Sequence, residues 1–183
     1  MNPTIATSAS PVAPAFDLAG PRTLDDLAAL DSPALERVYR AGRASTIAAL
    51  DGDPRCRMLA VRGAPGPVGA ALRAFAASSR FPWAGKSFAS ESASRGSGIN
   101  RVRLAGDRRW FPFVTTIEPS AIDGQPCVFL DYRLAANPKP IQMIRDELRE
   151  VAPGLFLGPA MFADGKRPPV LALWFACHHV SQN

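Results

Sequence analysis

The feature that most constrains the fold is the second half of the chain, residues 101–180, where large aromatic side chains fall inside segments of strand-like composition. This half predicts, in order, two strands, a turn, a strand, a helix and two further strands. An aromatic-rich antiparallel sheet of this kind is suited to enclosing a small apolar ligand. No recognisable catalytic motif accompanies it. The aromatic residues of the predicted strands are Trp110, Phe111, Phe113, Phe129, Tyr132, Phe156, Phe162, Trp174 and Phe175.

Alternation and turn signals place the individual strands. Side chains alternate in character over residues 99–104, and further strands are predicted over 110–118, 127–134, 155–163 and 170–178. Pro112 indicates an edge or a bulge, because proline has no N–H to donate to a ladder. Between the third and fourth of these strands, apolar residues recur at helical spacing. They predict one amphipathic helix whose buried stripe is Ile141, Ile144, Leu148 and Val151.

The first part of the chain is predicted to be largely helical. Thr23 and Ser32 are candidate N-caps, a short strand is expected at 57–61, and a third helix is expected over 68–79. Residues 1–20 are rich in Pro, Ala, Ser and Thr and are expected to be a disordered tail without signal-peptide features. The expected organisation is one globular domain over residues 21–183. Its helical part spans 21–80 and its antiparallel β part spans 81–183.

Composition argues against several classes of protein. Only three of the 21 basic residues are Lys and the Arg residues are scattered, so the formal charge of +5 does not indicate a nucleic-acid surface. Cys56, Cys127 and Cys177 make neither a disulfide framework nor a zinc site, which fits a reducing cytoplasm. No apolar run reaches membrane-spanning length. We therefore expect a cytoplasmic protein without a metal, a cofactor, a nucleic-acid partner or a membrane partner, and a homo-oligomer stays possible.

Seven short phrases, in this order along the chain, resemble a known family. They are Trp83-Ala84-Gly85-Lys86, Gly98-Ile99-Asn100-Arg101-Val102, Trp110-Phe111-Pro112-Phe113, Leu130-Asp131-Tyr132, Ile144-Arg145-Asp146-Glu147, Val151-Ala152-Pro153-Gly154-Leu155-Phe156-Leu157-Gly158 and Leu173-Trp174-Phe175-Ala176. Together they resemble small uncharacterised bacterial proteins with a lipocalin-like (calycin-like) barrel and extra N-terminal helices. The resemblance covers roughly residues 50–183. It implies a small, mostly hydrophobic bound molecule and implies no reaction.

The expected fold class is therefore mainly β or α+β. It is a curved antiparallel sheet or calycin-like β-barrel, with N-terminal helices and one amphipathic helix between the late strands. The predicted strands are fewer than the eight of a simple up-and-down barrel. Closure by the N-terminal helices and an open curved sheet are both left as alternatives.

Candidate ligand-binding residues lie in the predicted strands. Aromatic side chains would supply contact area, and arginines could clamp a carboxylate or phosphate. The competing interpretation is that Phe129, Asp131 and Arg133 form the wet outer face of a half-buried sheet. Trp83 and Lys86 would guard a pocket mouth or form a structural plug. The full set of candidates is Arg101, Arg103, Trp110, Phe111, Phe129, Tyr132, Arg133 and Trp174.

Candidate catalytic residues are Asp131, Glu147 and His178, should the protein be an enzyme. His178 could act as a general base oriented by Asp131, although a histidine near a C-terminus is more often an exposed strand end. Glu147 is expected on a solvated helix face, or near Lys86 beneath the sheet. The sequence has no phosphate-binding Gly-rich loop, no Gly-x-Ser-x-Gly elbow and no His-Glu-x-x-His motif.

These observations lead to two hypotheses and a third without a pocket. The first is the binding of a small hydrophobic or amphipathic molecule inside the sheet or barrel. The alternative is a cofactor-independent enzyme of secondary metabolism, an isomerase, cyclase or hydrolase, that uses the same cavity. The third is a structural or interaction module. A sheet interior filled by side chains would exclude the first.

Overall fold

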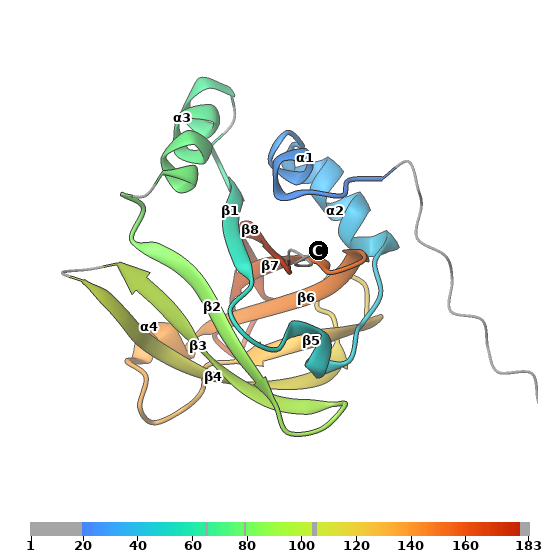
Figure 1. The fold of residues 1–183 in the computed structure, drawn as a ribbon, viewed down its shortest axis with the longest axis vertical. Helices are drawn as coiled ribbons and strands as arrows, with labels where there is room; N and C mark the ends of the chain where they lie inside the picture. The colour runs from blue at the N-terminus through green and yellow to red at the C-terminus, as the bar shows by residue number, and fades with distance from the viewer. Residues whose placement is uncertain (1–19, 65, 79, 104–105, 180–183) are drawn as a thin grey trace, which may run out of the picture.

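The computed structural model describes residues 20–64, 66–78, 80–103 and 106–179. The protein is mainly β, with short helices (Figure 1). The helical elements are α1 (Leu24–Ala28), α2 (Ser32–Ala41), the 3-10 turn η1 (Ile47–Leu50), α3 (Gly66–Ala77) and α4 (Lys139–Gln142). The strands are β1 (Arg55–Val61), β2 (Trp83–Ser90), β3 (Arg95–Arg103), β4 (Asp107–Pro119), β5 (Pro126–Asp131), β6 (Ile144–Ala152), β7 (Leu155–Phe162) and β8 (Val170–His178).

The eight strands form one antiparallel sheet in the order β1-β8-β7-β6-β5-β4-β3-β2. From β2 to β8 every strand pairs with its neighbour in sequence, and β1 pairs with β8. The sheet curls until β1 and β2 face each other, which gives a nearly closed barrel (Figure 1). The predicted calycin-like β-barrel is therefore confirmed, and it has the eight strands that sequence patterns did not all reveal.

The described residues of β1 and β2 form no continuous ladder of backbone hydrogen bonds with each other, and a few isolated contacts close the seam between them. Gly52 exchanges backbone hydrogen bonds of 3.0 and 2.9 Å with Phe88. Further along the seam, Arg101 Nη2 donates to the Pro54 carbonyl at 2.6 Å. Gly85 lies beneath this arginine with φ +124°, and a Cβ there would lie 2.9 Å from Nη2. The missing side chain of Gly85 therefore leaves room for Arg101 to cross β2.

Strand alternation divides the apolar residues between two cores. One core fills part of the barrel interior and includes Phe88, Phe113, Leu130, Phe156 and Phe175. The other lies on the outer face of the sheet, where α1 and α2 cover β7 and β8, and includes Leu35, Tyr39, Leu157 and Trp174. α3 stands away from this pair of helices, beside β1 (Figure 1).

The helix starts follow their capping signals closely. Thr23 caps α1 as predicted, in a capping box with Asp26. Ser32, predicted as a cap, is instead the first residue of α2, and Asp31 accepts the hydrogen bond from Ala34 N–H. The cap moves by one residue because an Asp also precedes the Ser-Pro pair.

The predicted amphipathic helix with the stripe Ile141, Ile144, Leu148 and Val151 is wrong. Only α4 is helical there, and β6 begins at Ile144. Asp146 and Leu148 point into the barrel, while Glu147 and Arg149 point outward. All four are buried. The three charged side chains can be buried because each has an ion-pair partner. Paired charges on both faces hide the period of two from a hydrophobicity pattern.

Other parts of the expected organisation compare directly with the structure. The strand expected at 57–61 is confirmed as part of β1. The segment 81–88, expected as an irregular transition, contains most of the strand β2, with a register shift between Trp83 and Gly85. The bulge indicated by Pro112 is confirmed where β3 meets β4. Residues 1–19 of the predicted tail, Ser79 and Leu104 lie outside the described residues. Among the helices in the described ranges, none has the length and apolar character needed to cross a membrane.

The packing of β7 on β6 gives a sharp test of the register. A Cβ on Gly158 would lie 1.5 Å from the Glu147 carbonyl oxygen, which belongs to the neighbouring backbone. We expect Gly158→Ala to lower the free energy of unfolding by about 3 kcal/mol or more, since the strands must move apart. Urea denaturation measures this change.

Gly106→Ala is the control, because Gly106 has φ +102° and open space around it. It isolates the backbone cost of a positive φ, about 1 kcal/mol. Equal losses in the two variants would contradict the β6–β7 register.

Candidate functional site

The barrel interior contains a cavity of about 350 Å³ between the filled part of the core and the end near α3. This volume falls within the range of small-molecule pockets. Its wall is mainly apolar and includes Met58, Trp83, Val102, Phe111, Leu173 and Phe175. The predicted interior cavity is present, so the condition that would have excluded a ligand in the barrel is not met.

Four polar side chains from four parts of the barrel meet at the floor of this cavity. Lys86 comes from β2, Asn100 from β3, Tyr132 from the residue after β5, and Asp146 from β6. All four are buried, with at most 7% of each residue exposed. Strand alternation directs each of them inward, where apolar side chains would be expected.

Lys86 is the centre of this cluster. Its Nζ donates to Asp146 Oδ2 at 2.8 Å, to Tyr132 Oη at 2.5 Å and to Asn100 Oδ1 at 3.1 Å. Tyr132 Oη in turn donates to Asp146 Oδ2 at 3.0 Å. The three N–H donors of the ammonium group are therefore all used within the protein.

Asn100 connects the cluster to the surrounding backbone. Its Oδ1 also accepts from Trp83 Nε1 at 2.9 Å, and its Nδ2 donates to the Phe111 carbonyl and to Tyr132 Oη, each at 3.1 Å. Phe111 is the bulged residue of β4 and has φ +59°, a strained conformation for a bulky side chain. The bulge turns this carbonyl toward Asn100 and leaves the Phe111 ring on the cavity wall.

The electrostatics of the cluster favour a charged lysine. Burial disfavours the ammonium form, but the Asp146 charge and hydrogen bonds outweigh burial and raise the pKa of Lys86 above its usual value. Burial, followed by the Asp146 charge, also raises the pKa of Tyr132. The ammonium nitrogen lies 5.1–5.5 Å from the ring centroids of Trp83, Phe113, Tyr132 and Phe175. A lysine held protonated in this way is not a nucleophile at neutral pH.

One acceptor in the cluster is left over. Asp146 Oδ1 is buried and has no hydrogen-bond partner among the described residues. Because Lys86 and Asp146 neutralise each other, the floor of the cavity has no net charge. The arrangement can cover an uncharged apolar molecule, and it offers no free donor to an anion.

The structure brings only two of the predicted ligand-binding residues to this cavity, Phe111 and Tyr132. Trp110 is 42% exposed on the outside. Trp174 lies in the outer core, where its Nε1 donates to Ser32 Oγ at 2.9 Å. Arg101 and Arg103 point away from the interior, toward the seam.

The outer face of β5 accounts for three further candidates. Phe129 lies beneath the Arg145 guanidinium, 4.4 Å from the ring centroid. Asp131 pairs with Arg133 at 2.8 Å beside it. All three therefore belong to the outside of the barrel, as the alternative interpretation of this face required.

The candidate catalytic residues are not together. Asp131 is on the outer face of β5, and His178 is at the seam. Glu147 is fully buried on the outer side of β6, where it accepts from Tyr39 Oη at 2.8 Å, Ser120 Oγ at 2.5 Å and Arg145 Nε at 2.7 Å. None of the three lines the cavity, so the enzymatic alternative loses the residues that the sequence suggested for it.

Sequence reasoning missed Lys86, Asn100 and Asp146 as a cluster. Sequence patterns place Lys86 at a pocket mouth, in a structural plug or near Glu147, and they assign no side-chain role to Asn100 or Asp146. The usable signal was a lysine within the apolar phrase Trp83-Ala84-Gly85-Lys86-Ser87-Phe88. Its partner could not be identified while residues 144–152 were interpreted as a helix.

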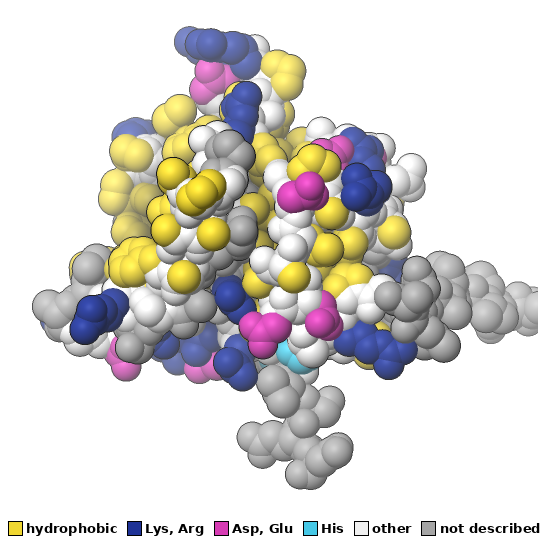
Figure 2. Space-filling view, turned by 90° about the horizontal axis from the view of Figure 1, so that it is seen from above, with side chains coloured by type: hydrophobic (Ala, Val, Ile, Leu, Met, Phe, Trp, Pro, Cys, Tyr) yellow, Lys and Arg dark blue, Asp and Glu magenta, His cyan; other side chains and the backbone are white. Residues whose placement is uncertain are grey.

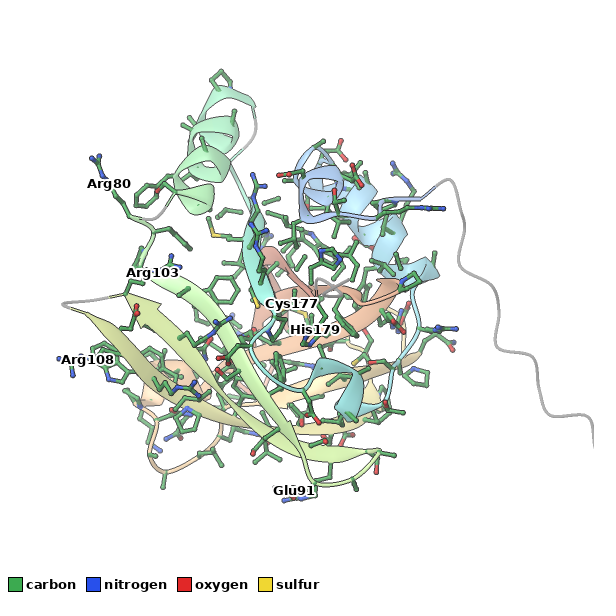
Figure 3. The ribbon with its side chains drawn as sticks, in the orientation of Figure 1. Arg80, Glu91, Arg103, Arg108, Cys177 and His179 are labelled. Carbon is green, nitrogen blue, oxygen red and sulfur yellow. The ribbon has the colours of Figure 1, made fainter. Side chains whose placement is uncertain are left out.

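A pair of thiols lies directly behind the cluster. Cys56 and Cys177 face each other across β1 and β8, with their sulfur atoms 2.8 Å apart, and both are free thiols. Figure 3 shows Cys177 in the middle of the molecule. Burial opposes ionisation of Cys56, but the hydrogen bonds from Cys177 and the Lys86 N–H, with the Lys86 and Arg101 charges, lower its pKa. Burial raises the pKa of Cys177, and it raises the pKa of Cys127 to about 12.

Comparison with known proteins adds a likeness of fold. No family model matches the chain, and no curated protein matches it. A solved crystal structure of a protein from Thermomonospora curvata is similar, with a TM-score of 0.50 and 17% identity over 82% of this chain and 88% of that one. At this identity the likeness shows the fold alone, and it agrees with a calycin-like barrel.

The Lys86–Asp146 pair can be tested by removing one or both charges. We expect Lys86→Met to lower the free energy of unfolding by about 3–5 kcal/mol at neutral pH, because it leaves a buried carboxylate unpaired. The double variant Lys86→Met with Asp146→Leu should recover most of this loss. The wild-type advantage over Lys86→Met should be full below the unfolded lysine pKa of about 10.4. It should shrink as pH rises further, because the folded pKa of Lys86 is raised.

The exposed pair Arg133–Asp131 provides the control. Arg133→Met should change the free energy of unfolding by less than about 1 kcal/mol. Similar values for Lys86→Met and Arg133→Met in urea denaturation would show that the buried pair does not have the assigned role.

Thiol reactivity gives a second test. We expect iodoacetamide to label Cys56 first in the folded protein, by at least about 10-fold in rate, because Cys56 is partly exposed and its pKa is lowered. Cys127 and Cys177 are buried with raised pKa values. Peptide mass spectrometry over time measures the order, and denatured protein, in which the three thiols should react alike, is the control. Earlier labelling of Cys127 would be inconsistent with this assignment.

Proposed function

We propose that the protein binds a small, uncharged and predominantly hydrophobic molecule inside its barrel. The observation that carries this proposal is an apolar cavity of about 350 Å³ in which Lys86 and Asp146, the only charged groups among its described lining residues, already neutralise each other. Aromatic rings around Lys86 cover most of the polar floor. Burial of apolar surface is then the main source of affinity.

The polar cluster sets the selectivity of this proposed site. An anionic ligand would enter a low-dielectric cavity in which every Lys86 donor is engaged, so it would lose its hydration without a matching partner. A hydroxyl group is compatible, because Asp146 Oδ1 still lacks a donor. The polar end of an amphipathic ligand is therefore a neutral hydrogen-bond donor.

A lipocalin-like role of this kind requires no reaction. General acid–base chemistry in the same cavity would need a group that changes protonation near neutral pH. The raised pKa values of Lys86 and Tyr132 move both groups away from that range. Binding without transformation is thus the function that the geometry supports best.

A matched series of ligands tests the proposal. Naphthalene, naphthol and naphthoate have one ring system and differ in polar group. We expect naphthol and naphthalene to bind, and naphthoate to bind at least about 10-fold more weakly, a difference of roughly 1.4 kcal/mol. Isothermal titration calorimetry at neutral pH measures the three dissociation constants.

Cavity filling provides the matched variants. Ala160 lines the cavity, so Ala160→Leu should weaken naphthol binding by at least about 10-fold. Ala163 lies just beyond β7 on the outside, and Ala163→Leu should leave the affinity within about twofold. Equal affinities in the two variants, or tighter binding of naphthoate than of naphthol, would overturn the proposal.

A further inference from the structure

A second concave surface lies outside the barrel, along the seam between β1 and β2. This seam groove has a volume of about 500 Å³ and is bordered by β1, β3, the start of α1 and the end of α3. Four arginines line it: Arg55 and Arg57 from β1, and Arg101 and Arg103 from β3. In the lower middle of Figure 2, basic and acidic side chains and a histidine gather on one face.

Strand alternation explains why the arginines share this groove. Cys56 points inward between Arg55 and Arg57, and Val102 points inward between Arg101 and Arg103. Arg101 reaches the β1 side only because it passes over Gly85 to the Pro54 carbonyl. Two edges of the sheet therefore direct their basic side chains to one place.

The acidic residues of the groove do not balance this charge. Asp25 is bound to Arg57 at 2.6 Å, and Asp53 is shared between Ser87 and the more distant Arg109. The guanidinium groups of Arg55 and Arg103 have no hydrogen-bond or ion-pair partner among the described residues. Among the residues that the structure describes, four guanidinium charges thus face two carboxylates, and two of the guanidinium groups have no partner.

Buried hydrogen-bond donors in the seam groove also lack acceptors. The Nε atoms of Arg57 and Arg101 are buried and unpartnered, although a buried donor normally has an acceptor. His178 lies in the same groove, and burial followed by the Arg55 and His179 charges lowers its pKa. A neutral imidazole at physiological pH can donate one hydrogen bond without adding a charge.

We propose that the seam groove binds a phosphate-type oxyanion, either inorganic phosphate or the terminal group of a phosphate monoester. The planar forks of Arg55 and Arg103 would bind it from two sides, and the unpartnered Nε groups lie in the same groove. This site is separate from the barrel cavity, since of all the residues that line the two only Trp83 is common to both. It does not depend on the function proposed above.

The experiment is a phosphate titration of the full chain at constant ionic strength, with chloride as the balancing anion. The readout is the set of arginine Nε–H signals in nitrogen-15 NMR spectra. We expect saturable shifts of a small group of these signals. The double variant Arg55→Gln with Arg103→Gln should raise the phosphate dissociation constant by at least about 10-fold, because charge-assisted hydrogen bonds are lost. Phenyl phosphate in place of phosphate tests the monoester.

Two other arginines provide a control with the same loss of charge. Arg108 and Arg167 are exposed outside the seam groove, and Figure 3 shows Arg108 at the side of the molecule, away from Cys177. Arg108→Gln with Arg167→Gln should change the constant by less than about twofold. Equal weakening by both double variants would overturn the proposal, because it would show only a general charge effect. Absence of saturable shifts at about 10 mM phosphate would overturn it as well.

Discussion

The ion pair between Lys86 and Asp146 is the interaction on which the barrel interior depends. Removing two charges from water costs several kcal/mol, and their attraction offsets this cost only when the remaining polar valences are satisfied. Tyr132 and Asn100 supply those partners here. Because Lys86 is on the edge strand β2 and Asp146 is on β6, the pair connects opposite walls across the interior. It thereby fixes an edge strand that has a ladder on one side only.

On the outer side of β6, buried charges are again satisfied by dedicated partners, but the partners are different groups. Glu147, the next residue, accepts four hydrogen bonds from Tyr39, Ser120, Ala121 and Arg145. Arg149 is almost fully buried and forms a bidentate pair with Asp123 at 2.6 and 2.8 Å. Three of the charged residues of β6, Asp146, Glu147 and Arg149, can be buried only when each charge has a dedicated partner. On the outer side, these partners come from the helix α2, the turn before β5 and Arg145 of β6 itself.

Sequence patterns predicted the class of fold well where local signals were strong. β8 matches its predicted range, and the capping box at Thr23 and the bulge at Pro112 follow from short-range stereochemistry. The strand β6 failed because Asp146, Glu147 and Arg149 are buried through contacts that are distant in sequence. Because neither β6 nor β2 is predicted as a strand, the sequence does not identify Asp146 as the partner of Lys86. The polar cluster of the interior therefore cannot be predicted. Aromatic composition alone brought Phe111 and Tyr132 to the cavity wall but left Trp110 and Trp174 outside it, because it does not say which face of a strand a ring occupies.

The strand β3 shows how one short segment serves two different surfaces. Asn100 and Val102 face the cavity, while Arg101 and Arg103 face the seam groove. A slip of one residue in register would place guanidinium groups in the apolar interior and leave the polar cluster without Asn100. At the bulge, the Phe111 carbonyl accepts a hydrogen bond from Asn100 Nδ2. Across the seam, the Pro54 carbonyl accepts one from Arg101 Nη2. The strained backbone at Phe111 therefore helps to fix the register of β3. Contacts on both faces of this strand, which separates a cavity without net charge from a basic groove, compensate for the strain.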